Sequence, residues 1–185
     1  MDDTLGSAIA ATLHHARASQ GWSVATLAER AGVSRAMIGK IERGEAQPTA
    51  VLLGRLSGAL GWSLSQLLAR AEGDTGRVAR RAAQAVWTDP GTGYVRRAVS
   101  PNTGGPLELV EVELPAGAEV AFPVESYLHA HHQIWVLDGH LVFRDDDTEH
   151  ELAAGDCLEL STPRPGAYLN RSDAPCRYLV VLARR

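Results

Sequence analysis

Residues Ser34 to Arg43 combine basic and small side chains in a pattern that suits contact with DNA. In a helix, spacings of three and four residues bring these side chains to one face. Guanidinium and ammonium groups bind phosphates and guanine edges, and small residues allow close approach to the major groove. The residues predicted to contact DNA are Ser34, Arg35, Ala36, Met37, Gly39, Lys40 and Arg43, although Met37 also fits the inner stripe with Ile38 and Ile41. The alternative is a small helical bundle whose basic side chains are only solvated.

A second group of residues capable of chemistry lies between 125 and 132. His129, His131 and His132 follow Glu125 closely, and imidazoles with a carboxylate are ligands for iron, manganese or zinc. A non-standard metal site formed by these four residues stays open, although we expect no cofactor. The alternative is that His129 and His131 lie on a loop, and that His132 faces the interior as a ligand-binding or satisfied core imidazole.

If His132 faces inward on a strand, alternation places Ile134 and Val136 on the same side, and Gln133 and Trp135 on the other. An apolar interior with a few polar groups is typical of a small-molecule site. The predicted ligand-binding residues are His132, Ile134, Val136, Tyr127, Phe143, Tyr168 and Asn170, with Tyr94 and Tyr178 as further candidates. For each aromatic residue, plain core packing is the alternative.

Short helices with clear end signals must position the basic group. Ser23 and Ser34 are typical N-caps, and Gly32 between them can end a helix. Apolar spacing predicts a first helix over residues 4–20 and a fourth from Thr49. The inward residues expected in the first, second and fourth helices are Leu5, Ile9, Leu13 and Ala16; Leu27, Ala28 and Ala31; and Leu52, Leu53, Leu56, Ala59 and Leu60. Ser63 and Gln66 have the spacing of a capping box that opens a fifth helix, so this unit ends near Arg70.

Residues 21–44 resemble the Cro/lambda-repressor-like helix-turn-helix of the XRE type. The matching positions are Leu27, Ala28, Gly32, Val33, Ser34, Ile38, Ile41, Glu42, Gly44 and Pro48. The resemblance implies that Ser34, Arg35, Ala36 and Lys40 contact the groove and that Arg43 contacts phosphate. It also implies a structural ion pair between Arg17 and Glu42. Val24 stands where many relatives place a polar phosphate-binding side chain.

After a predicted linker over residues 71–92, the pattern changes from helical to alternating. We expect residues 71–84 to form a solvated tether, because they lack a sustained apolar stripe. The alternatives are a helical turn or two within VARRAAQAV, and contacts of Arg77, Arg80 and Arg81 with DNA phosphate. Many short strand-like runs separated by Gly, Pro and Asp then predict an antiparallel sandwich or barrel. The acidic run at 145–147 fits a hairpin turn better than a calcium loop.

The runs HHQIWVLDGHLVF and LAAGDCLELSTPRPGAYLN resemble the two motifs of a cupin, over about residues 93–185. With the helical segment, the chain is similar to XRE-type regulators that carry a C-terminal cupin sensor. This resemblance implies an all-α five-helix head (1–70) and an all-β double-stranded β-helix barrel (93–185). Some proteins that join these two domains are iron enzymes. The present chain departs from their ligand pattern, since His132 replaces a glutamate and Gly166 a histidine.

Composition is consistent with a soluble regulator. The 185-residue chain has a net charge of −4, but residues 1–70 carry seven Arg or Lys against five Asp or Glu, and residues 85–185 carry eight against fifteen. A weakly basic head predicts weak, salt-sensitive binding by one copy, so we expect a homodimer. Cys157 and Cys176 are expected to be reduced core thiols, because two cysteines form no disulfide framework. Without an apolar run long enough to cross a membrane, we expect a cytoplasmic protein.

These observations predict a homodimeric, ligand-responsive transcriptional repressor that is not an enzyme. Its partners would be double-stranded DNA with an inverted-repeat operator and a small-molecule effector of unknown identity. Two alternatives stay open. The chain is then either a metal-dependent cupin enzyme with an attached helix-turn-helix domain, or a regulator whose cupin only dimerises.

Overall fold

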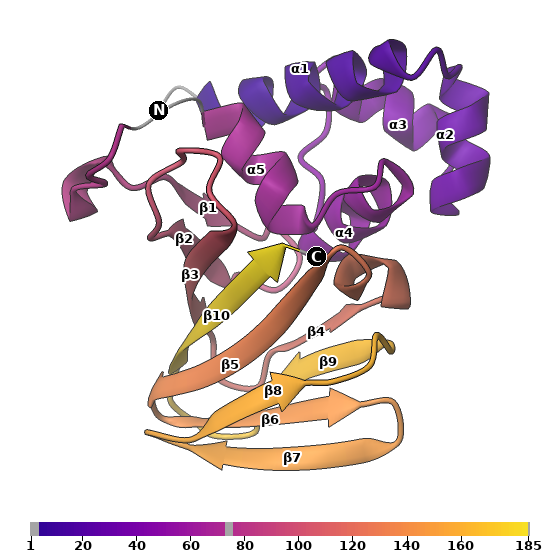
Figure 1. The fold of residues 1–185 in the computed structure, drawn as a ribbon. Coiled ribbons are helices and arrows are strands. Elements are labelled where there is room, and N and C mark those ends of the chain that lie inside the picture. The colour runs from indigo at the N-terminus through magenta and orange to yellow at the C-terminus, as the bar shows by residue number, and fades with distance from the viewer. Residues whose placement is uncertain (1–3, 73–75, 185) are drawn as a thin grey trace.

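The computed structural model describes residues 4–72 and 76–184. Within this part of the chain, residues 4–72 form a helical head of five α-helices. The helices are α1 (Thr4–Ser19), α2 (Val24–Ala31), α3 (Arg35–Glu42), α4 (Ala50–Ala59) and α5 (Leu64–Glu72). Figure 1 shows the helical head at one end of the molecule, above the sheets. No helix among the described residues is both long and apolar enough to cross a membrane.

The predicted helix caps are confirmed. The Oγ atoms of Ser23 and Ser34 accept hydrogen bonds from backbone N–H groups at the starts of α2 and α3, at 3.0 and 3.2 Å. Gly32 ends α2 with a left-handed φ of 62°, which favours glycine. Ser63 and Gln66 form the reciprocal capping box, with both bonds at 3.0 Å. These caps fix the turn between α2 and α3, and with it the orientation of α3.

The head has a single apolar core, and most of the predicted inward residues lie in it. Leu13 of α1, Leu27 of α2 and Ile38 of α3 are each at most 1% exposed. Arg17 and Glu42 form the expected ion pair, with Nε–Oε1 and Nη2–Oε2 distances of 2.7 and 2.8 Å. The inward assignment of Met37 is wrong, since its side chain is 38% exposed. Its position next to Ile38 turns it to the outer side of this short helix.

Residues 86–184 form a sheet domain of two antiparallel sheets. Its strands are β1 (Val86–Thr88), β2 (Val95–Ala98), β3 (Leu107–Leu114), β4 (Glu119–Phe122), β5 (Ala130–Asp138), β6 (His140–Asp145), β7 (Thr148–Ala153), β8 (Cys157–Leu160), β9 (Gly166–Leu169) and β10 (Cys176–Arg184). The strand orders are β1-β2-β3-β10-β5-β8 and β4-β9-β6-β7. The expected closed barrel is not confirmed, because no strand pairing joins the two sheets in the described residues. As predicted, the acidic run ends at a hairpin turn, where Asp146 has a φ of 55°.

The second half of the predicted linker is ordered, which corrects the expectation of a linker through residue 92. A short 3-10 helix, η1 (Arg81–Ala83), precedes β1, and β1 pairs with β2. Trp87 in β1 packs against both the core of the sheet domain and the core of the helical head. Sequence patterns do not predict β1, because a three-residue strand is too short to show alternation.

Polar contacts and a glycine notch hold the helical head against the sheet domain. The buried carboxylate of Asp89 accepts hydrogen bonds from the backbone N–H of Ala50, at the start of α4, and from Thr92. On α4, Gly54 and Gly58 leave room for a second 3-10 helix, η2 (Val124–Tyr127). A Cβ on Gly58 would lie 2.7 Å from the Cβ of Glu125. The surfaces of the two domains are therefore complementary at this boundary.

Candidate DNA-binding face and ligand cavity

The outer side of α3 presents the residues predicted to contact DNA. Arg35, Ala36 and Lys40 are exposed, as is the Ser34 cap, while Gly39 is half-buried. Ile38 and Ile41 anchor the opposite side of α3 in the head core, each at 1% exposure. The face therefore combines two exposed cations with small residues on a helix of fixed orientation. This arrangement suits insertion into a major groove.

Arg43, predicted to contact phosphate, is already paired in the structure. Its Nε and Nη2 atoms donate to the two carboxylate oxygens of Glu45, each at 2.7 Å. This bidentate hydrogen bond lowers the pKa of Glu45, and both side chains are exposed. A Cβ on Gly39 would lie 3.0 Å from Nη1 of Arg43, so the guanidinium group lies beside the outer face of α3. A DNA phosphate would have to replace or share Glu45. Sequence reasoning missed this pair.

A cavity of about 70 Å³ lies where the helical head meets the sheet domain. Three of the predicted ligand-binding residues line it, namely Tyr127, His132 and Tyr168. The further candidates Tyr94 and Tyr178 line it as well. The remaining lining residues are Ser63, Leu64, Ser65, Arg96, Val110, Val112, Val120, Phe122, Ser126, Val180 and Leu182.

Four predicted ligand-binding residues are not among those that line this cavity. Ile134, Val136 and Phe143 lie in the core of the sheet domain, each at most 1% exposed. Asn170 is structural: its Nδ2 donates to the backbone oxygens of Leu114 and Ala174, and its Oδ1 accepts from Ser172. Strand alternation correctly placed Ile134 and Val136 inside the sheet domain, but an inward side chain can pack in the core without reaching a cavity.

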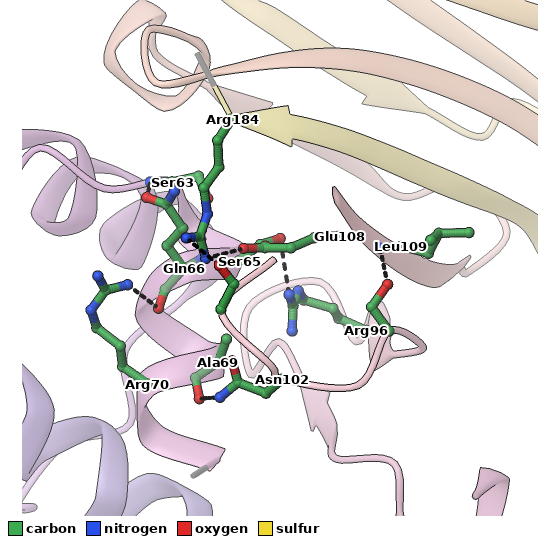
Figure 2. A network of polar contacts seen from close by, with 12 residues as sticks. Ser63, Ser65, Gln66, Ala69, Arg70, Arg96, Asn102, Glu108, Leu109 and Arg184 are labelled. Atoms are coloured by element: carbon green, nitrogen blue, oxygen red, sulfur yellow. Dashed lines mark hydrogen bonds and ion pairs between the residues drawn. The ribbon is translucent and has the colours of Figure 1, made fainter. Parts of the chain in front are cut away.

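Sequence reasoning missed the contribution of the helical head to the cavity wall. Ser63 caps the start of α5, Ser65 lies in its first turn, and Arg96 comes from the neighbouring strand β2. Arg96 is only 4% exposed, and its Nη2 donates to Oγ of Ser65 at 2.9 Å. Figure 2 shows Arg96 close to Glu108 as well. The available signal was the position of Arg96 on the inward side of an alternating strand. An arginine is almost never fully buried unless it is paired, so a partner could have been expected.

Neutral hydroxyl groups dominate the polar part of the cavity. Burial raises the pKa of Tyr94, Tyr127 and Tyr168, so these phenols stay protonated and can donate hydrogen bonds. The rings of Tyr127 and His132 meet edge to face, with centroids 5.2 Å apart. Ser126 is 7% exposed, and its Oγ has no hydrogen-bond partner among the described residues. The Oγ is therefore available to a bound molecule.

The residues considered for a metal do not fit one. His131 and His132 are neighbours on β5, so their side chains point to opposite faces, and only His132 is buried. Glu125 is exposed and packs on Gly58 of α4. Among the described residues, no group of three or more His, Cys, Asp or Glu side chains is placed to bind a metal ion. The four-residue metal hypothesis therefore finds no geometric basis.

The two cysteines differ from each other, and one expectation is corrected. Cys176 is a buried thiol as predicted, and burial raises its pKa to about 11. Cys157 is exposed, so it is not a core residue. It begins β8, the edge strand of the six-stranded sheet, where its side chain alternates to the outer face.

Comparisons with known proteins match both parts of the chain. A helix-turn-helix family model matches residues 13–67, and a cupin domain model matches residues 110–182. The HTH-type transcriptional regulator SutR of Escherichia coli strain K12 is 41% identical over 58 residues. That alignment covers 31% of this chain and 33% of SutR, so the chain matches about a third of that protein.

Solved structures extend the similarity to the full length. An HTH_3 family transcriptional regulator from Vibrio cholerae superposes with a TM-score of 0.80 at 25% identity, covering 100% of this chain and 99% of that one. Hydroxypropylphosphonic acid epoxidase from S. wedmorenis covers 98% of this chain and all of its own, at 19% identity and a TM-score of 0.46. A TM-score of 0.46 is too low to bear on function. The chain thus joins a helix-turn-helix domain of the XRE (HTH_3) type to a cupin domain.

Proposed function

We propose that the protein is a DNA-binding transcriptional regulator that acts as a homodimer. The observation that carries this proposal is the outer face of α3, where Arg35 and Lys40 are exposed on a helix whose other side is anchored in the head core. The names of the E. coli and V. cholerae relatives support it. Ser34, Ala36, Met37 and Gly39 complete the proposed groove-facing set, and Arg43 is assigned to phosphate.

Footprinting on genomic fragments selected by the purified protein tests this proposal. A two-fold symmetric dimer requires an inverted repeat with half-site centres about one helical turn, or a multiple of it, apart. Arg35→Ala and Lys40→Ala should each relax base preference, at about 1–3 kcal/mol if the side chain makes a bidentate base contact. Arg43→Ala should weaken all sequences alike. Equal losses on operator and random DNA for all three variants would contradict this division of roles.

We further propose that a small molecule bound in the cavity changes operator affinity, so that the regulator is a ligand-responsive repressor. The cavity supports this because Ser63 and Ser65 of the helical head and His132 and Tyr168 of the sheet domain line the same space. A molecule bound there contacts both domains, which is the requirement for a ligand to favour one head orientation over another.

Native mass spectrometry of the purified protein, with metal analysis of the same sample, tests oligomer and ligand together. A dimer with a retained organic mass supports the sensor, and His132→Ala should then lose the mass and the effector response. The competing proposal is that the cupin only dimerises the heads, in which case no small molecule changes DNA affinity. A stoichiometric metal would revive the enzyme alternative, although the geometry around His132 offers no support for it.

A further inference from the structure

The charged side chain that lines the cavity already has partners. Arg96 is the only Arg, Lys, Asp or Glu among the described residues that line it. Its Nη2 atom donates to Oγ of Ser65 at 2.9 Å, and its guanidinium group lies close to the Glu108 carboxylate, as Figure 2 shows. Glu108 is not among the lining residues, so this neighbour lies outside the cavity. A charged ligand would therefore have to displace one of these contacts.

The rest of the wall is neutral and mostly apolar. Branched aliphatic side chains from β3, β4 and β10 face the cavity, represented by Val112, Val120 and Leu182. Burial raises the pKa of the tyrosine phenols, so these groups carry no charge. Nδ1 of His132 already has a neighbour, the backbone oxygen of Ala130 at 3.2 Å. Moving an ion from water into such surroundings costs far more free energy than moving a neutral polar molecule.

Ser126 supplies the polar group that a neutral ligand would contact. Its side chain lines the cavity and is 7% exposed, and its Oγ has no hydrogen-bond partner among the described residues. A buried hydroxyl without a partner is uncommon, because the loss of its hydrogen bonds to water costs free energy. A ligand hydroxyl or carbonyl would restore a hydrogen bond, since a serine hydroxyl can both donate and accept.

The cavity admits only a small molecule. A volume of about 70 Å³ holds about five or six water molecules, so the enclosed part of a ligand has about five non-hydrogen atoms. We infer that the effector is a small neutral aliphatic alcohol or ketone whose oxygen is bound by the hydroxyl of Ser126. Its apolar body lies against the valines of β3 and β10. This inference rests on the proposed ligand-responsive function, because it names the chemical class that the cavity recognises.

The position of Ser126 connects such a ligand to the helical head. Ser126 belongs to η2, which packs on Gly54 and Gly58 of α4. Leu53 of α4 shares the head core with Ile38 of α3. A ligand bound to Ser126 therefore acts on the segment that supports α4, and through α4 on the orientation of α3.

Two pairs of probes of equal size test the proposal on the full-length protein at about pH 8. Isobutanol is compared with isobutylammonium, and butan-2-one with propionate, so the members of each pair differ in charge but hardly in shape. Ligand-observed NMR titrations measure their affinities. We expect the two neutral probes to bind with dissociation constants in the micromolar to millimolar range, and the ions to bind at least about tenfold more weakly.

Ser126→Ala should weaken binding of both neutral probes about 3- to 10-fold, because it removes one hydrogen bond. Ser57→Ala is the matched control. Ser57 is a buried serine of α4 that donates to the backbone oxygen of Gly54 at 3.1 Å and does not line the cavity, so this variant should leave both affinities within about twofold of the wild-type values. If Ser126→Ala fails to fold, judged by circular dichroism, Ser126→Cys takes its place, since a thiol is only a weak donor and acceptor.

The proposal is overturned if neither neutral probe binds, if an ion binds as tightly as its neutral partner, or if the Ser126 and Ser57 variants affect binding equally. DNA binding with and without isobutanol, measured in parallel, separates this failure from that of the proposed function. Selective DNA binding without probe binding leaves the regulator intact and removes the neutral effector. Probe binding that depends on Ser126 without any change in DNA affinity retains the site and removes the ligand response.

Discussion

Replacing Gly58 by alanine tests how closely α4 packs on the sheet domain. In an exposed helix interior, alanine is favoured over glycine by about 1 kcal/mol. At this position, however, the new Cβ would lie 2.7 Å from the Cβ and 3.2 Å from the backbone carbon of Glu125, where about 3.5–4.0 Å is optimal. Overpacking of this kind costs about 1–3 kcal/mol, so Gly58→Ala should destabilise the protein by about 1 kcal/mol net.

Gly39→Ala in α3 is the matched control. Its Cβ would lie 3.0 Å from Nη1 of Arg43, the far end of a flexible and exposed side chain that can move away. The propensity gain should then survive, and the variant should be more stable than the wild type by up to about 1 kcal/mol. Both helices belong to the same head core, so the two variants report on the same unfolding unit.

Urea denaturation followed by tryptophan fluorescence and by circular dichroism measures both free energies of unfolding. The expected difference between the two variants is about 2 kcal/mol, with opposite signs relative to the wild type. Gly58→Ala and Gly39→Ala variants that are equally stabilised would refute the reasoning, because η2 could then not be packed on Gly58.

Three further predictions concern single side chains. Glu45→Gln should strengthen binding to operator and random DNA alike and steepen its salt dependence by about one counterion, since it releases Arg43; an unchanged salt slope in a binding titration would argue against this. In the folded protein at about pH 8, iodoacetamide should modify Cys157 and spare Cys176, whose thiol is buried with a pKa of about 11; mass spectrometry locates the label, and early labelling of Cys176 would contradict its burial. Asp89→Ala should lower the free energy of unfolding by about 3 kcal/mol, because it leaves the first turn of α4 without its buried acceptor; a thermal melt unaffected by the change would rule this out.

The helical head could be predicted from the sequence because its signals are local. Ser23, Gly32 and Ser34 act within one or two helical turns, and the apolar spacing between them sets the core. Met37 shows the limit of this reasoning. It stands next to Ile38 at the edge of the apolar stripe, and in an eight-residue helix the rotation of the face is set by packing and not by spacing alone.

The candidate cavity could be predicted only in part, because its wall comes from both domains. Alternation placed His132, Ile134 and Val136 inside the sheet domain, and His132 does line the cavity. Ser65 and Arg96 are 31 residues apart, and no periodic pattern reports a contact at that separation. The same holds for Asp89, whose role as a cap for α4 depends on a partner 39 residues away.

The contacts that Trp87 and Asp89 make across the domain boundary mean that the two domains are not interchangeable modules. A chimera that grafts this helical head onto another cupin would lose the packing of η2 on Gly54 and Gly58. It would also lose the Asp89 carboxylate that accepts from the backbone N–H of Ala50 at the start of α4. The reverse graft would leave the Asp89 carboxylate without a backbone donor and Trp87 without half of its packing. Under the proposed function, a change of DNA specificity in this scaffold therefore has to be made residue by residue on the outer face of α3, and not by exchange of whole domains.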